Sequence, residues 1–243
     1  MNLGKVKYQC ALFGDFREYL PSTERIMTLL EIYKDKKLIP ITFYEYIPPN
    51  PNPVNRIAFA SENNEWQFNI ASPRLEIFHN SLNLSGDNLG SIQSFIEESA
   101  DIFNRFLSNY GKKGNRLSLL GELYFDDENK EKYDNFYLKL RKPNNLYAEK
   151  FPFEWCIRDV TRKNVEENKF METFNIITEI NRSQRHVILN NELKSSDRIS
   201  IFLDINSIPE NIDTRFDRDR IMWGLNKAVL YFSSLIAEME NMQ

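Results

Sequence analysis

The sequence predicts an α+β protein in which antiparallel strands are covered by long helices. Three observations predict this fold class. Apolar residues recur at every second position in many short stretches, as they do in half-buried strands. Two longer stretches repeat their apolar residues with helical spacing instead. The links between successive strands are short, and short links require antiparallel pairing because a parallel crossover needs a dozen or more residues.

The composition is that of an ordinary folded protein. The chain has 243 residues, of which 42% are hydrophobic and 27% charged, and its 18 Phe and 11 Tyr provide ample bulk for a core. The net charge of −4 lacks the basic excess of nucleic-acid binders, so nucleic acid is not expected as a direct ligand. No stretch approaches the ~18 apolar residues that span a bilayer, and residues 1–14 do not resemble a signal peptide. We therefore expect a cytoplasmic protein without membrane contact.

The first half of the chain is expected to begin with a strand, because Val6, Tyr8, Cys10 and Leu12 lie on alternate positions. A helix follows from Ser22, whose hydroxyl suits the N-cap position. The stretch "PPNPNP" ends the next strand, because proline lacks the amide donor that a sheet requires. The expected strands of this half span residues 6–12, 39–47, 54–60, 65–71, 75–78 and 117–125.

One row of large side chains in this half is predicted to be core. Trp66, Phe68 and Ile70 alternate along a strand, and the helix expected over residues 92–110 carries a matching apolar stripe that Gly111 ends. The helix would cover the row, so the row is not expected to be a partner surface. Function is expected on the opposite sheet face, at Gln67, Asn69 and Glu76, and on the charged segment 126–150.

The second half is expected to repeat this order of elements. Strands are predicted at 153–157, 170–180, 187–189 and 199–205, with turns at 181–184 and 194–197, and a long helix runs from about residue 217 to the end. The predicted domains are a first unit at 1–126, a charged linker or loop at 127–150 and a second unit at 151–243. The two units are expected to pack as one globule.

The predicted architecture is therefore two antiparallel-sheet-plus-long-helix units in tandem. The order of elements repeats, but no residue-level repeat accompanies it. The strand at 116–125 could pair with the sheet of either unit. A hot-dog-like fold is the alternative, since it also combines a curved antiparallel sheet with a long helix.

The sequence offers no set of reactive residues. It contains no glycine-rich phosphate loop and no nucleophile elbow, and its two His and two Cys are too scattered for a zinc site. Cys10 and Cys156 lie in apolar alternating runs and are expected to be buried free thiols. His79 is expected to be a polar strand-end residue and His186 a turn residue. No catalytic, cofactor-binding or metal-binding residue is predicted, and no cofactor.

The acidic residues are also not expected to form a catalytic or metal site. Glu122, Asp126 and Asp127 surround a strand end, as metal-binding acids of some nucleases do, but no Glu-x-Lys follows on a neighbouring apolar strand. Asp204 is expected on a solvated strand face. The remaining candidates are expected to be solvated helix residues: Glu97, Glu98, Asp101, Asp217 and Asp219.

Several stretches resemble a sporadically distributed, uncharacterised family of bacterial proteins. The matching parts are Arg56, the strand Trp66 to Ile70, the strand Leu75 to Phe78, and Leu203-Asp204-Ile205 before a final helix. They cover about half of the chain, and their motifs are structural. The chain departs from the family pattern in "LLGELYFDD", where the family tends to carry an Arg-Tyr-x-Asn strand.

The resemblance implies a duplicated export-chaperone-like (SecB-like) fold and a binding or adaptor role. Family members often sit in anti-phage neighbourhoods. The expected function is thus a non-catalytic sensor or chaperone-like component of a bacterial anti-phage defence or toxin-regulating system, with a protein partner or self-association. The alternatives are a hot-dog-like thioesterase or dehydratase and, less favoured, a nuclease-associated subunit. An enzyme should hold an enclosed pocket with a carboxylate of raised pKa, whereas a binding protein should expose an apolar groove or patch.

Overall fold

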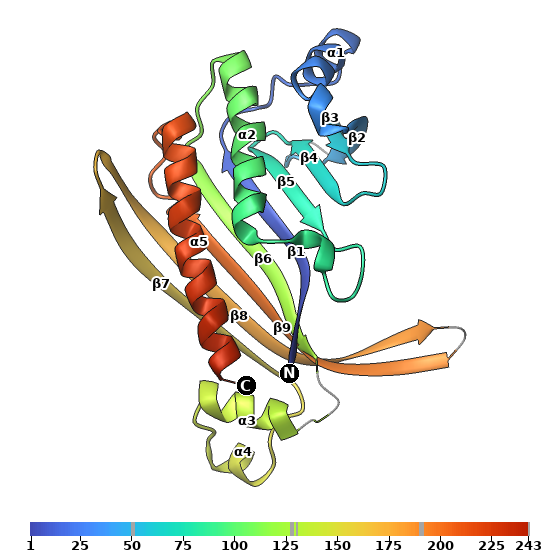
Figure 1. Cartoon of the computed structure of the whole chain (residues 1–243), viewed down its shortest axis with the longest axis vertical. Helices are drawn as coiled ribbons and strands as arrows, with labels where there is room; N and C mark the ends of the chain where they lie inside the picture. The colour runs from blue at the N-terminus through green and yellow to red at the C-terminus, as the bar shows by residue number, and fades with distance from the viewer. Residues whose placement is uncertain (50–51, 127–128, 130, 190–191, 243) are drawn as a thin grey trace.

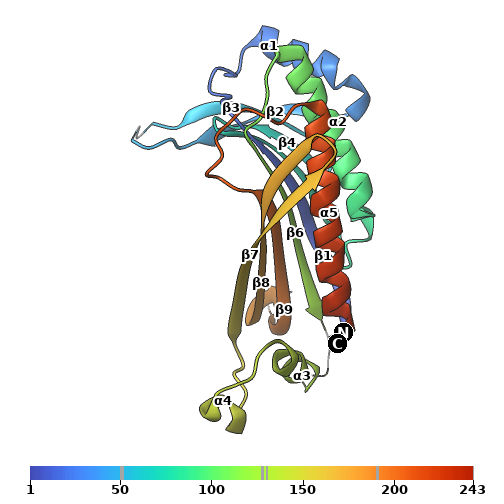
Figure 2. The same cartoon turned by 90° about the vertical axis from the view of Figure 1, so that its left-hand side faces the viewer.

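The computed structural model describes residues 1–49, 52–126, 129, 131–189 and 192–242, with the backbone alone at 146, 148, 184–189 and 192–196. Within them the strands form one antiparallel sheet of nine strands in the order β2-β3-β4-β5-β1-β6-β9-β8-β7. The two longest helices lie side by side on one face of this sheet (Figures 1 and 2). In chain order the elements are β1 (Asn2–Phe13), α1 (Thr23–Ile32), β2 (Ile39–Glu45), β3 (Val54–Ala60), β4 (Trp66–Ile70), β5 (Arg74–Asn80), α2 (Ile92–Tyr110), β6 (Arg116–Asp126), α3 (Glu131–Leu140), α4 (Asn145–Glu149), β7 (Trp155–Glu167), β8 (Phe170–Leu189), β9 (Glu192–Ser207) and α5 (Arg218–Asn241).

The predicted α+β class and the antiparallel pairing of the strands are confirmed. The strands of the two halves form one continuous sheet. β6 joins the two halves of the chain, because it is bonded to β1 on one side and to β9 on the other. Leu117 lies opposite Leu12, and Leu119 lies opposite both Cys10 and Ile205. The question of which sheet this strand joins is thus answered: it belongs to both halves.

Helix α2 begins and ends where the sequence indicates. The Ser91 hydroxyl accepts a hydrogen bond from the Ser94 amide at 3.1 Å, and Gly111 ends the helix at φ 61°. The same kind of cap starts α1, where the Ser22 hydroxyl accepts from the Arg25 amide at 3.2 Å. The apolar stripe of α2 is buried against the sheet, as predicted.

The alternating row on β4 is core, as predicted. Phe68 and Ile70 are fully buried and Trp66 is half-buried. The Phe68 ring lies 6.4 Å from that of Phe59 on β3, and the Tyr33 ring packs edge-on against Phe68 at 5.4 Å. The covered face of the sheet is therefore held by interlocking aromatic rings.

Helix α5 packs beside α2 and across the central strands. Asp217 caps it by accepting from the Arg220 amide at 3.2 Å. The ring of Phe232 occupies the space over Gly121 of β6, where a β-carbon would overlap it. Close approach of helix and sheet at this point therefore requires glycine.

The segment between the halves, expected to be a linker or loop, contains α3 and α4. Tyr133, Phe136 and Tyr137 of α3 are buried, and Phe136 packs edge-on against Phe125 of β6 at 5.6 Å. Arg182 of β8 reaches α3 by an ion pair with Asp134 at 2.6 Å. Helix α3 thereby closes the lower end of the core in Figure 1.

Strands β8 and β9 are longer than the sequence predicts. The turns expected at 181–184 and 194–197 are wrong, since both stretches lie within the paired strands: residues 181–184 are opposite 197–200, and residues 194–197 are opposite 184–187. β7 also continues to Glu167, far beyond the expected end at residue 157. The extension of β8 and β9 projects beyond the helices, and the extension of β7 is an edge strand whose side chains are mostly exposed (Figure 1). Such strands need no apolar alternation.

Candidate functional site

The residues that a nuclease-like site would use do not converge. Glu122 is ion-paired with Lys7 at 3.0 Å, whereas Asp126 lies 3.4 Å from the hydroxyl of Tyr133. Asp127 lies outside the described residues. In the part of the chain that the structure describes, no three His, Cys, Asp or Glu side chains are grouped to hold a metal.

The other acidic candidates have structural partners. Lys36 is ion-paired with both Glu98 and Asp101 of α2, at 2.8 and 2.7 Å. Asp204 accepts a hydrogen bond from the Ser118 hydroxyl at 2.8 Å on the sheet face away from the helices. Asp217 is the cap of α5, and the remaining helix acids, Glu97 and Asp219, are exposed.

Only one of the two cysteines is buried. Cys10 is buried as predicted, and burial raises the pKa of its thiol to about 12. The prediction for Cys156 is wrong, because this residue lies exposed on the outermost strand β7. Among the described residues, neither cysteine has a histidine side chain in contact with it.

His79 is more enclosed than its strand-end position predicts. It is 5% exposed and its ring stacks on Trp66 at 4.0 Å. Its Nε2 lies 3.0 Å from a carboxylate oxygen of Glu65, and burial lowers the pKa of the imidazole. The backbone of His186 lies within β8 and not at a turn, and its side chain is outside the described part.

A chain of polar contacts runs across the uncovered face of the sheet. The side-chain oxygen of Asn206 accepts from Arg116 at 2.9 Å and from Asn175 at 3.2 Å. Arg162 of β7 extends the chain by donating to Asn175 at 3.0 Å. Asn206 is only 1% exposed. Hydrogen bonds therefore satisfy polar groups that the curved sheet and its loops bury.

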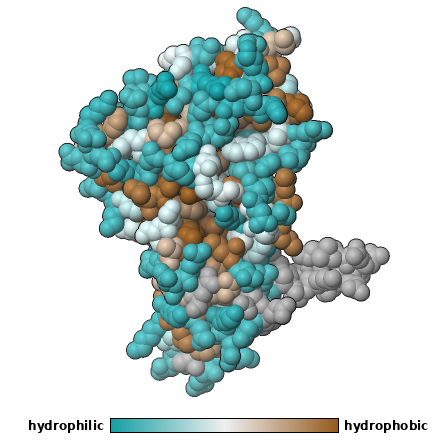
Figure 3. All heavy atoms as spheres, viewed as in Figure 1, coloured by the Kyte–Doolittle hydropathy of each residue, from teal (hydrophilic) through white to brown (hydrophobic). Residues whose placement is uncertain are grey.

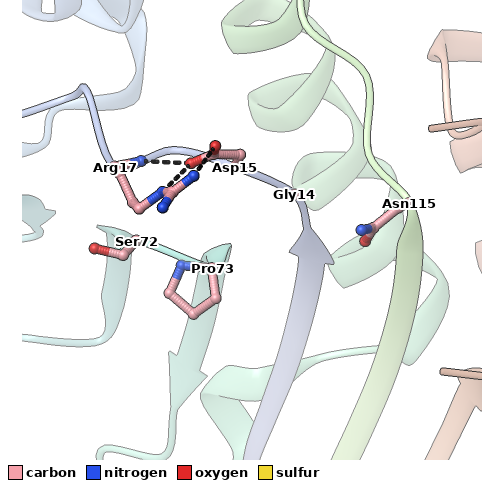
Figure 4. Close-up of a pocket in the computed structure, with 6 residues that line it drawn as sticks. All are labelled: Gly14, Asp15, Arg17, Ser72, Pro73 and Asn115. Carbon is pink, nitrogen blue, oxygen red and sulfur yellow. Dashed lines mark hydrogen bonds and ion pairs between the residues drawn. The ribbon is translucent and has the colours of Figure 1, made fainter. Parts of the chain in front are cut away.

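Two adjoining cavities lie where this chain of contacts meets the ends of the central strands. Their volumes are about 310 and 260 Å³, near the lower end of the range for small-molecule pockets. Figure 4 shows the first, with Asp15 and Arg17 paired on one side and Asn115, just before β6, on the other. We call the two together the strand-end trough; its lining is Phe13, Gly14, Asp15, Arg17, Ser72, Pro73, Asn115, Arg116, Pro209, Asn211 and Ile212.

A row of three residues from neighbouring strands lies at this trough. Phe13 of β1 is paired in register with Arg74 of β5 and with Arg116 of β6. Both guanidinium groups lie over its ring, at 5.7 Å for Arg74 and 4.7 Å for Arg116. Arg74 is also ion-paired with Glu76 at 2.8 Å. The sequence does not reveal this row, because its members are up to about a hundred residues apart and only the strand register joins them.

A loop held by ion pairs forms one wall of the trough. Arg215, in the connection from β9 to α5, makes a two-point contact with the buried carboxylate of Glu172, at 2.7 and 2.9 Å. The same connection pairs with the start of β6 through a bridge between Gly114 and Phe216. Pro209, Asn211 and Ile212 are therefore held beside Arg116 by contacts outside the trough.

An apolar crevice of about 280 Å³ lies on the opposite face, between the end of α5, α3 and strands β7 and β8. Figure 3 shows hydrophobic side chains reaching the surface along α5. Two carboxylates, Asp159 and Glu238, lie at its rim. Its apolar lining consists of Leu140, Val160, Ile176, Ile180, Leu235, Met239 and Met242.

The two edge strands of the sheet differ in chemistry. β2 exposes Ile39, Ile41 and Tyr44, and its one charged residue, Glu45, is bound to the hydroxyl of Ser72 at 2.6 Å. β7 exposes mainly charged side chains: Arg158, Asp159, Arg162, Lys163, Glu166 and Glu167. Charges on an edge oppose pairing with another strand, so only β7 is protected in this way.

No protein-family model, curated protein or solved structure matches this chain. Across the described residues, no helix is both long enough and apolar enough to cross a membrane.

Proposed function

We propose that the protein is a non-catalytic binding protein that takes up an extended polypeptide segment along strand β2. The observation that carries this proposal is the apolar, unpaired edge of β2. Within the described part of the chain, β2 is bonded to β3 alone, and Ile39 and Ile41 stand exposed opposite Ala60 and Ala58. A segment added to such an edge gains backbone hydrogen bonds, except from Pro40, which has no amide donor, and it gains apolar contacts as well.

The carboxyl groups favour a binding protein over a hot-dog-like enzyme. An acid catalyst needs a carboxyl group of raised pKa. Every shifted carboxyl pKa among the described residues is lowered instead; hydrogen bonds from Arg105, for example, lower the pKa of Asp35. The other lowered groups are Asp15, Glu18, Glu65, Asp101, Glu167 and Glu210.

We further propose that the sheet consists of two related units that meet at β1 and β6. On each side of α2 the first strand pairs with the last strand before a long helix: β1 with β5 before α2, and β6 with β9 before α5. This division assigns β6 to the second unit, which then starts at residue 116 and not at residue 151. This wiring supports the SecB-like tandem arrangement that the family resemblance implies. Self-association and the defence or toxin-regulating context come from the same resemblance and stay predictions.

The binding test uses a permanently unfolded polypeptide, fluorescein-labelled α-lactalbumin that has been reduced and carboxymethylated. We expect saturable binding by fluorescence anisotropy, weakened about tenfold or more in Ile41→Lys because a charge now lies on the edge. Leu230→Lys on α5 is the control, since Leu230 lies outside this edge and is 62% exposed, whereas Ile41 is 39% exposed. Equal affinity of the two variants would contradict the proposal.

A further inference from the structure

We propose that the strand-end trough binds a carboxylate attached to a small apolar group. This inference concerns a different surface from β2, so each proposal can fail alone. It depends on the contacts of one guanidinium, on two unused donors and on the mixture of charge and apolar surface that surrounds them.

Arg116 is the cation of the site. It is half-buried, and no carboxylate of the described residues lies within ion-pair distance of it. Its Nε donates to the Ser207 carbonyl at 3.0 Å, and its Nη2 donates to Asn206 at 2.9 Å. A partly desolvated cation with no carboxylate in contact with it is costly, and burial lowers the pKa of Arg116. A bound anion would offset that cost.

Two donors at the trough have no partner among the described residues. The second terminal nitrogen of Arg116, Nη1, makes no hydrogen bond there, and neither does the side-chain amide of Asn115. Both residues line the 260 Å³ cavity. A planar carboxylate has two oxygens, one for each donor, and hydrogen bonds between such charged partners are roughly twice as strong as neutral ones.

The surroundings favour one negative charge on an apolar body. Asp204 and Glu210 act on Arg116 from beyond contact distance, so they would repel a dianion such as phosphate more strongly than a singly charged carboxylate. The aromatic ring of Phe13 and the side chain of Ile212 face the same cavity, together with two prolines, Pro73 and Pro209. Ile212 is 77% exposed, although it is an aliphatic side chain held on a fixed loop. An aliphatic group of the ligand, next to its carboxylate, would cover the exposed side chain of Ile212.

Such a group can belong to a free small acid or to the last residue of a polypeptide. Isothermal titration with N-acetyl-leucine and with N-acetyl-leucinamide tests the carboxylate itself. Acetyl-Gly-Ala-Gly-Leu, as the free acid and as the amide, tests the chain end. We expect each acid to bind about 10- to 100-fold more tightly than its amide, because the amide loses the charged contact. Tighter binding of the peptide acid identifies a chain end as the ligand, and tighter binding of N-acetyl-leucine identifies a free acid.

Two variants and a control make the test specific. Arg116→Gln should abolish the preference for acid over amide. Arg116 also binds Asn206, so its substitution could disturb the structure, and a second variant is needed at an exposed side chain. Ile212→Glu should lower the affinity for both acids by about tenfold or more and leave the stability of the protein unchanged. Leu230→Glu, on the exposed side of α5, should change nothing. Equal binding of acids and amides, no saturable heat for any probe, or full affinity in Ile212→Glu would overturn the proposal.

Discussion

The two faces of the sheet are held by different interactions. On the covered face, aromatic and aliphatic side chains of β4, β5 and β1 pack against α2 and α5, with Phe68, Ile77 and Cys10 fully buried. On the uncovered face, side chains are tied by hydrogen bonds and ion pairs, such as those from Arg162 through Asn175 to Asn206. Apolar packing dominates folding free energy, whereas a polar, accessible face can exchange its partners. Stability and recognition are thus expected on opposite sides of one sheet.

The largest expected difference comes from the same substitution on the two faces. Phe68→Ala should destabilise the protein by about 3–5 kcal/mol, because it opens a cavity in the core. Phe202→Ala, at a half-buried position on the uncovered face, should cost about 1–2 kcal/mol. Urea unfolding followed by circular dichroism measures both. Equal losses would mean that the uncovered face carries as much of the core as the covered one.

A pair of glycines provides a second comparison of moderate size. A β-carbon on Gly121 would overlap the ring of Phe232, which is locked between helix and sheet, so Gly121→Ala should cost about 1–3 kcal/mol. A β-carbon on Gly4 would overlap the ring of Tyr124, which is partly exposed and can turn aside by giving up the hydrogen bond from its hydroxyl to the Leu84 carbonyl, so Gly4→Ala should cost about 1 kcal/mol. A greater loss in Gly4→Ala, by thermal unfolding, would reverse the ranking of the two faces.

The smallest expected effect is a pH dependence confined to the covered face. Burial lowers the pKa of His79 below the ~6.5 of the unfolded chain, so the unfolded state binds the proton more readily. The stability that neutral His79 contributes is complete above about pH 6.5 and is lost as the pH falls towards the folded pKa. Urea unfolding at pH 7.5, 6.5 and 5.5 should therefore show the advantage of wild type over His79→Gln shrinking with acid. A constant difference would contradict this prediction.

The elements packed against the covered face could be predicted, and the reason is physical. Burial on one side makes apolar residues alternate along a strand and line up as a stripe along a helix. The sequence therefore predicts that Phe68, Ile70 and the apolar residues of α2 are buried. Local chemistry marks the ends as well, through Ser22 and Gly111. Elements exposed on both sides leave no such pattern, and β7 beyond residue 157 was missed for that reason.

The trough could not be predicted because it is a product of strand register. Phe13, Arg74 and Arg116 are ordinary strand-end residues in sequence, and only the pairing of β1 with β5 and β6 brings them together. The one available signal is an arginine at the first position of both β5 and β6. The burial of Asn206 could not be predicted either. The alternating pattern of its strand predicts a solvated side chain at this position, but the curved sheet buries it.

The central pairing of β1 with β6 also determines when the sheet can be completed. The two strands are separated by roughly a hundred residues, so at ~5–20 residues per second β1 waits about 5–20 seconds on the ribosome for its second neighbour. The meander from β2 to β5 and helix α2 are made of nearer contacts and can form first. During synthesis, strands β2 to β5 and helix α2 therefore have to cover the apolar side of β1, with Tyr8 and Leu12, to keep it from aggregating.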